Sequence, residues 1–150
     1  MSATTGESPL FPSVKWFEAL RALVNNDAEF RRIGTVDTVM GVNAGSRKFV
    51  LTFEAFECTA IDEIAPGDLP DVDFYLEMPD SGWQEMLENI KEHGGADLTH
   101  TLNTLDLVSA DGIAKNDDGD QLRLDLFFRL NHSIQHFFNT SSNLDTKFQF

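Results

Sequence analysis

The strongest constraint on the fold is a change of hydrophobic period along the chain. Apolar and polar residues alternate with a period of two in four segments between residues 36 and 78, a pattern typical of half-buried strands. Before and after this region, apolar residues recur every three to four positions, as they do in amphipathic helices. The two patterns in this order predict an α+β domain. The four predicted strands are 36–42, 47–53, 56–62 and 72–78.

Capping residues mark two helices before the first predicted strand. Ser13 precedes a run with helical spacing that contains Trp16, and a shorter helix follows Asp27 and ends at Gly34. Both helices are expected to place one apolar side against the sheet.

Two further helices are predicted after the strands. Ser81 and Gln84 have the spacing of a capping box, and the helix that follows them ends at Gly94. Asp120 is expected to cap a final helix over 121–138, whose apolar residues follow one another at steps of three to four.

The remaining segments are short or polar. A short helix or turn at 97–103 leads to a fifth predicted strand at 105–108, and a long acidic loop covers 109–120. We expect residues 1–12 to be a flexible lead and residues 140–150 a loose C-terminal tail, with a single domain over 13–139.

Charge and cysteine content exclude several classes of function. The chain has 11 Lys and Arg against 25 Asp and Glu, a net charge of −14, which argues against nucleic-acid binding. No apolar run approaches the roughly 18 residues of a membrane span, so stable membrane insertion is not expected. The N-terminal sequence lacks the features of a secretory signal. Cys58 has no partner for a disulfide and is expected to be a small buried residue.

Four blocks of sequence share an order of size and polarity with a known family. They are Val72-Asp73-Phe74-Tyr75-Leu76, Trp83 with Met86-Leu87, Gly94-Gly95-Ala96-Asp97 and Thr104-Leu105-Asp106-Leu107. This order resembles the sterol-carrier-protein (SCP-2-like) domain, over about residues 14–138. The resemblance implies a five-stranded, mostly antiparallel sheet covered on one side by helices, with an apolar cavity between them. It implies binding of fatty acyl chains, sterols or similar lipids, and no catalytic residue.

The expected function is therefore non-catalytic binding or carriage of an apolar small molecule. Phe occurs 13 times in the 150 residues, which fits a cavity lined by aromatic rings or a Phe-rich core. Burial of apolar surface, worth about 25 cal/mol per Å², is enough to bind a chain of a dozen or so methylenes. The expected ligand-binding residues lie on the sheet and the final helix: Phe49, Leu51, Phe53, Phe74, Leu76, Met78, Leu126, Phe127, Leu130 and Phe137.

The C-terminal residues bear on localisation. Phe148-Gln149-Phe150 differs from the small-basic-Leu peroxisomal address that some SCP-2-like proteins carry, so we expect a cytoplasmic protein.

Two alternatives remain open at this point. Small isomerases and hydrolases with a cone-shaped NTF2-like fold also begin with helices and enclose an apolar cavity. Their chains usually end in long paired strands, whereas a helix is predicted at 121–138 here. The other alternative is a regulatory or structural domain whose core is simply filled.

Histidine and acidic motifs provide weak signals of a metal site. His132 and His136 have the i, i+4 spacing of metal ligands, but Ser133 stands where a zinc protease has Glu, and only His100 is available as a third ligand. Asn116, Asp118 and Gly119 resemble part of a calcium loop that lacks its acidic first ligand. We expect no metal and no cofactor.

Three carboxylates could in principle act as acids or bases. Asp37, Asp73 and Glu77 lie on predicted strands at positions opposite the Phe residues, and therefore are expected to face water. On this basis we expect the protein not to be an enzyme.

Overall fold

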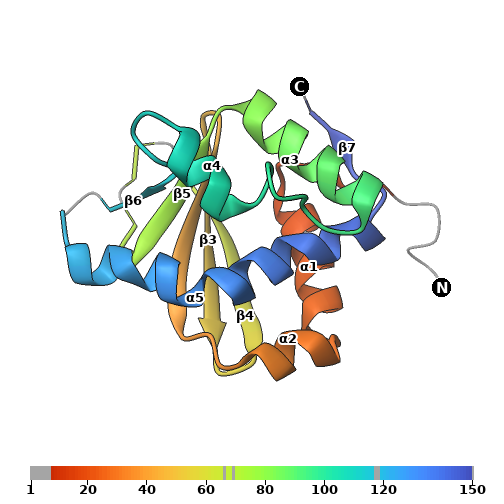
Figure 1. Ribbon diagram of the computed structural model, residues 1–150, viewed down its shortest axis with the longest axis horizontal. Helices are drawn as coiled ribbons and strands as arrows, with labels where there is room; N and C mark the ends of the chain where they lie inside the picture. Colours follow the sequence, from red (N-terminus) through yellow and green to blue (C-terminus); the bar gives the residue numbers. More distant parts are fainter. Residues whose placement is uncertain (1–7, 66, 69, 117–118, 150) are drawn as a thin grey trace.

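The protein is an α+β structure in which a five-stranded sheet is bordered by helices (Figure 1). The computed structural model describes residues 8–65, 67–68, 70–116 and 119–149. The strands are β1 (Leu10–Phe11), β2 (Thr38–Ala44), β3 (Arg47–Glu54), β4 (Glu57–Ile64), β5 (Phe74–Met78), β6 (Ala114–Lys115) and β7 (Lys147–Phe148). The helices are α1 (Val14–Asn25), α2 (Ala28–Ile33), α3 (Asp80–His93), α4 (Leu102–Val108), α5 (Gln121–Asn139) and the 3₁₀ turn η1 (Thr140–Asn143).

The main sheet has the strand order β4-β3-β2-β5-β6. β2, β3 and β4 form an antiparallel meander, and β6 is antiparallel to β5, but β5 runs parallel to β2. The sheet is thus mixed and mostly antiparallel, and the four strands predicted between residues 36 and 78 are confirmed within a few residues.

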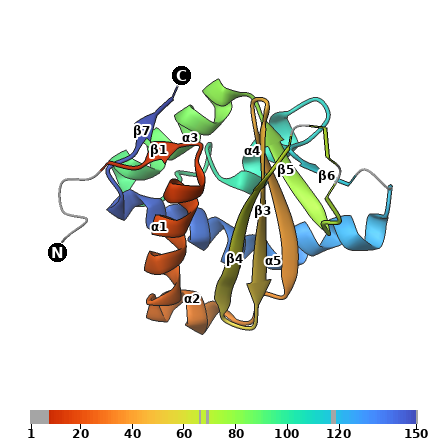
Figure 2. The ribbon, with the colours of Figure 1, turned by 180° about the vertical axis from the view of Figure 1, so that it is seen from behind.

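The helices lie over one face of this sheet. On β3, Phe49, Leu51 and Phe53 are buried, whereas Val50 and Thr52 between them are only half-buried. Figure 2 shows the strands in front and α5 behind them, so within the described residues no helix covers the near face of the strands. The alternation in the sequence is explained by this arrangement, because successive side chains of a strand point to opposite faces.

Three helix starts occur where their capping residues predict them. The side chains of Ser13, Asp27 and Asp120 accept hydrogen bonds from backbone N–H groups in the first turns of α1, α2 and α5. The capping box predicted at Ser81 is wrong. α3 begins at Asp80 after Pro79, which makes no side-chain cap bond, so Ser81 lies inside the first turn.

The fifth strand predicted at 105–108 is also wrong. These residues belong to α4, whose N-terminus is capped by Thr101, and the fifth strand of the sheet is β6, inside the predicted acidic loop. The Asp106 carboxylate accepts hydrogen bonds from the backbone N–H groups of Ile113 and Ala114, so α4 holds β6 in place. A four-residue segment with three apolar residues fits a helix as well as a strand, which explains the error.

The described parts of the expected lead and tail are ordered. β7 pairs in parallel with β1, and the Lys147 N–H donates to the Pro9 carbonyl at 3.0 Å. Phe11 is fully buried, and the Trp16 indole N–H donates to Thr146 Oγ1 at 2.9 Å. Local sequence patterns missed this contact because it joins segments more than a hundred residues apart. Residues 1–7 and 150 lie outside the described part of the chain.

No helix in the described part of the chain has the length and apolar character needed to cross a membrane.

Candidate functional site

The residues expected to bind a ligand lie in the apolar layer between the sheet and the helices α1, α3 and α5. All the expected sheet residues are buried, and so are Phe127 and Phe137 of α5. Leu126 and Leu130 of α5 are half-buried. Buried residues of the sheet and the helices form one continuous core, with Leu126 and Leu130 packed against it.

Ring contacts show that the expected residues fall under different helices. Phe74 of β5 meets Phe127 edge-on with ring centroids 5.7 Å apart, and Phe53 of β3 meets Phe137 at 5.2 Å. Phe49, in contrast, contacts Phe17 of α1 at 5.0 Å. The structure thus forms two separate ring pairs between the sheet and α5, Phe74 with Phe127 and Phe53 with Phe137, and places Phe49 beneath α1.

Met78 lies at another edge of the layer. It is the last residue of β5, and its side chain lies beside Gly82 in the first turn of α3. Met78 therefore lies under α3, away from the Phe rings beneath α5.

The helices α4 and α5 expose several large apolar side chains. Leu107 and Val108 of α4 are 74% and 73% exposed, and Leu122 and Phe128 of α5 are 78% and 48% exposed. The ring of Phe128 contacts that of Phe127, which continues into the buried layer. The sequence analysis missed Phe128 as a candidate, although the wide apolar surface of α5 was a signal for this residue. It also placed Leu107 on a strand.

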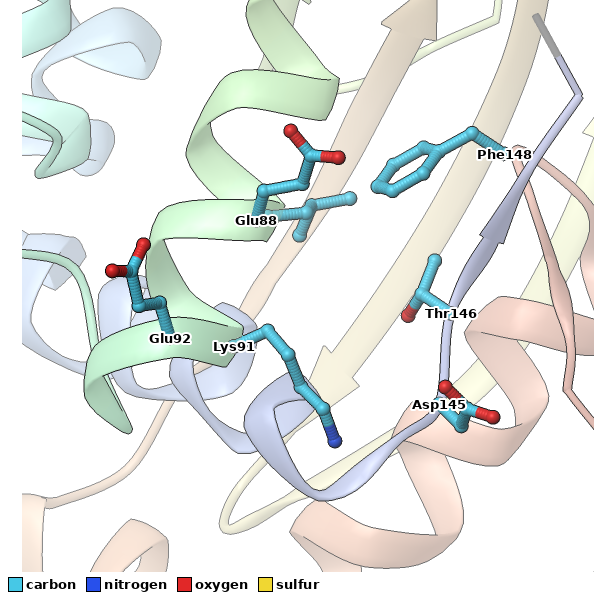
Figure 3. A pocket seen from close by; sticks show the side chains of 7 residues that line it. Glu88, Lys91, Glu92, Asp145, Thr146 and Phe148 are labelled. Carbon is cyan, nitrogen blue, oxygen red and sulfur yellow. The ribbon is translucent and has the colours of Figure 1, made fainter.

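Two surface grooves lie away from this apolar layer. One, of about 480 Å³, is bounded by α3 and the C-terminal segment (Figure 3). Glu88, Lys91, Glu92 and Asp145 give it a polar lining, and Phe148 points across it toward α3. The other, of about 450 Å³, lies where β5 ends, beside residues 109–113. Neither groove was predicted from the sequence.

The three carboxylates considered for catalysis do not meet as a pair. Asp73 accepts hydrogen bonds from Thr38 Oγ1 and the Val39 N–H, and Arg123 lies beside it at 3.2 Å. Burial acts to raise the pKa of Asp73, but these hydrogen bonds outweigh it and the pKa lies below its usual value. Glu77 pairs with Lys115 at 2.8 Å, and this hydrogen bond lowers its pKa.

Asp37 has a structural partner as well. Its Oδ1 accepts from the Ala55 N–H at the β3–β4 turn, where Ala55 has a φ of 54°. The three carboxylates are therefore engaged in holding strands and turns, and the pKa values of Asp73 and Glu77 are lowered, whereas a general acid has a raised one.

The Cys58 thiol is inaccessible, and the imidazoles of His100 and His136 are engaged with carboxylates, whereas His93 and His132 are exposed. Cys58 is fully buried, and burial raises its pKa to about 12, so its thiolate is scarce at neutral pH. His136 Nε2 lies 2.7 Å from Asp27 Oδ2, and His100 lies between Asp97 and Glu85. Among the described residues, no three His, Cys, Asp or Glu side chains form a group that could hold a metal ion.

Two solved structures share this arrangement of elements. No family model matches the sequence, and no curated protein matches it either. The crystal structure of sterol carrier protein 2 superposes with a TM-score of 0.54 at 14% identity, over 87% of this chain and 95% of the other. The solution structure of a conserved hypothetical protein from Thermus thermophilus, described as possibly a sterol carrier protein, gives 0.58 at 15% identity over 90% of each chain. The chain has an SCP-2-like fold.

The SCP-2-like fold bears out the expected architecture of a five-stranded sheet with helices on one side. It does not fit the cone-shaped alternative. After β6 the described chain forms α5, η1 and the two-residue β7, where chains with the cone fold usually have long paired strands.

Proposed function

We propose that this protein binds an apolar small molecule, a fatty acyl chain, sterol or similar lipid, without converting it chemically. The ligand would lie in the apolar layer between the sheet and α5. The observation that carries the proposal is the SCP-2-like fold combined with a layer of Phe rings beneath one incompletely buried helix.

α5 is the best candidate for the element that admits the ligand. The inward side of α1 is sealed, because Trp16, Phe17 and Leu20 are fully buried. α5 instead has half-buried leucines at positions 126 and 130 next to fully buried Phe127. A ligand that separates this end of α5 from the sheet therefore disturbs less buried surface than one that separates α1.

Binding of an apolar ligand at such a site needs few polar partners. Transfer of a methylene from water to an apolar interior is worth about 0.8 kcal/mol, so a chain of about a dozen methylenes gains enough to offset the entropy of association. The engaged state of Asp37, Asp73 and Glu77 and the buried thiol of Cys58 support binding without catalysis.

Equilibrium titration with a fluorescent long-chain acyl probe tests the proposal. We expect saturable uptake by the folded protein, and displacement of the probe by unlabelled dodecanoic acid or cholesterol. Native mass spectrometry of the protein purified from its own host would identify a retained ligand. A folded protein that takes up no apolar probe saturably would leave only a filled structural core.

A further inference from the structure

Three amide side chains form a row along one side of α5. Asn131, Gln135 and Asn139 follow one another at intervals of four residues, which places them on the same helix face. Gln135 Nε2 donates to Asn139 Oδ1 at 3.0 Å, so the last two members are bonded to each other.

Gln135 and Asn139 also bind the backbone that precedes α4. Gln135 Oε1 accepts a hydrogen bond at 2.7 Å from the N–H of Leu102, the first residue of α4. Asn139 Oδ1 accepts from the Ala96 N–H at 3.1 Å. The two amides thereby fasten the segment between α3 and α4 to α5.

Asn131 is the exception in this row. Its Nδ2 is buried and has no hydrogen-bond partner among the described residues. An unpaired buried donor is unfavourable by a few kcal/mol, and native proteins contain few of them.

We infer that the Asn131 amide binds the polar end of the apolar ligand. The inference rests on the proposed function and deepens it, because it defines the ligand as an amphiphile with one hydrogen-bond-accepting oxygen. Phe127 lies one turn before Asn131 on the same side of α5 and would contact the adjoining methylenes. A carboxylate and a hydroxyl share this accepting chemistry, and the carboxylate forms the stronger bond.

The test compares Asn131→Leu with the control Asn103→Leu. Asn103 lies exposed on neighbouring α4, so its replacement makes the same chemical change outside the site. The ligands are dodecanoic acid, dodecanol and pyrene, which has no polar end. Dissociation constants are measured by isothermal titration or by displacement of the fluorescent acyl probe, and melting temperatures by circular dichroism.

We expect Asn131→Leu to bind dodecanoic acid about tenfold more weakly, the size of a lost hydrogen bond to a charged group. The affinity of Asn131→Leu for dodecanol should fall less, and its affinity for pyrene should equal that of wild type. Asn103→Leu should change none of these affinities. The melting temperature of Asn131→Leu should be unchanged or higher, because an unpaired buried donor has been removed.

Three results would overturn the inference. Unchanged affinity of Asn131→Leu for both oxygen-bearing ligands would show that Asn131 is not an anchor, while the proposed function stands. An equal loss for pyrene would show that the substitution altered the apolar layer itself. A large drop in melting temperature would show that Asn131 has a structural partner. If wild type binds neither pyrene nor dodecanoic acid saturably, the proposed function fails, and the anchor with it.

Discussion

His136 Nε2 lies 2.7 Å from Asp27 Oδ2, and this pair fastens α5 to α2. Asp27 also caps α2, because its Oδ1 accepts from the Glu29 N–H at 2.9 Å. The imidazole of His136 stacks on the ring of Phe30, with centroids 6.3 Å apart. One carboxylate thus orients a short helix and holds the helix that covers the candidate site.

Asp27→Asn should lower stability near neutral pH and lose its effect in acid. Burial acts to raise the pKa of Asp27, but the hydrogen bonds from His136 and Glu29 outweigh it, and the pKa lies below the ordinary value of 3.8. A lowered folded-state pKa contributes stability above the unfolded pKa, and that contribution is lost as pH falls through the folded pKa. Asn retains the cap of α2, so the change isolates the contact with His136.

For this variant we expect a loss of about 1 kcal/mol at pH 6, allowing for the partial exposure of both side chains. Urea denaturation at a series of pH values measures it. The difference between the wild-type and variant curves should begin to shrink below about pH 4 and close as the pH falls through the lowered pKa of Asp27. A difference that does not shrink at all between pH 6 and pH 2 would show that Asp27 acts through something other than its charge.

Gly41→Ala should destabilise the centre of the sheet. Gly41 of β2 is paired with Tyr75 of β5, and a Cβ at position 41 would lie 2.8 Å from the Tyr75 Cβ. That distance forces two neighbouring strands apart, so we expect a loss of about 1–3 kcal/mol in urea denaturation. Gly67→Ala, where a Cβ meets no atom within 4 Å, is the matched control and should be neutral. Equal stability of the two variants would contradict the close approach.

Thr146→Val should destabilise the contact between the N- and C-terminal segments. The Trp16 indole N–H donates to Thr146 Oγ1, and Trp16 is fully buried. Valine has almost the same shape as threonine but cannot accept a hydrogen bond. The indole N–H is then left unpaired, which should lower the free energy of unfolding by about 1–3 kcal/mol. The exposed Thr35 provides the control Thr35→Val, which should stay within about 0.5 kcal/mol of wild type. Thermal melts that do not distinguish the two variants would show that the tail contributes no stability.

Leu130→Trp distinguishes a ligand site beneath α5 from a filled core. Leu130 is half-buried, so a larger side chain can occupy space that a ligand would use. We expect affinity for the acyl probe to fall while the free energy of unfolding stays within about 1 kcal/mol of wild type. Ile134 lies one turn further along α5 and is 1% exposed. Ile134→Trp should instead overpack the core and lower the free energy of unfolding by about 1–3 kcal/mol. A lower melting temperature for Leu130→Trp with unchanged probe affinity would place the ligand elsewhere.

The strands between residues 36 and 78 could be predicted because the alternation of apolar and polar residues within each segment shows which of its side chains are buried. Phe49, Leu51 and Phe53 alternate with polar or smaller residues on β3, and the same residues point into the core. The cap at Asp120 and the helix stop at Gly94, which has a φ of 78°, were local in the same sense. Such features depend on residues within a few positions of one another.

The candidate site was only partly predictable. The sequence indicated that Phe53, Phe74, Phe127 and Phe137 are apolar and inward-facing, and in the structure they form two ring pairs between the sheet and α5. It could not show that Phe49 lies under α1 instead, because that depends on where α1 crosses the sheet. Nor could it single out Asn131, which differs from Gln135 and Asn139 in having a buried amide nitrogen without a partner among the described residues.

By itself, the sequence determined the periodic elements, the single thiol and the net charge of −14. The tertiary structure decided that 105–108 is helical, that Ala114–Lys115 completes the sheet, and that Lys147–Phe148 pairs with Leu10–Phe11. The physical reason is that hydrophobic period reports whether a segment is buried, whereas strand pairing and buried hydrogen bonds depend on which distant segment supplies the opposite surface.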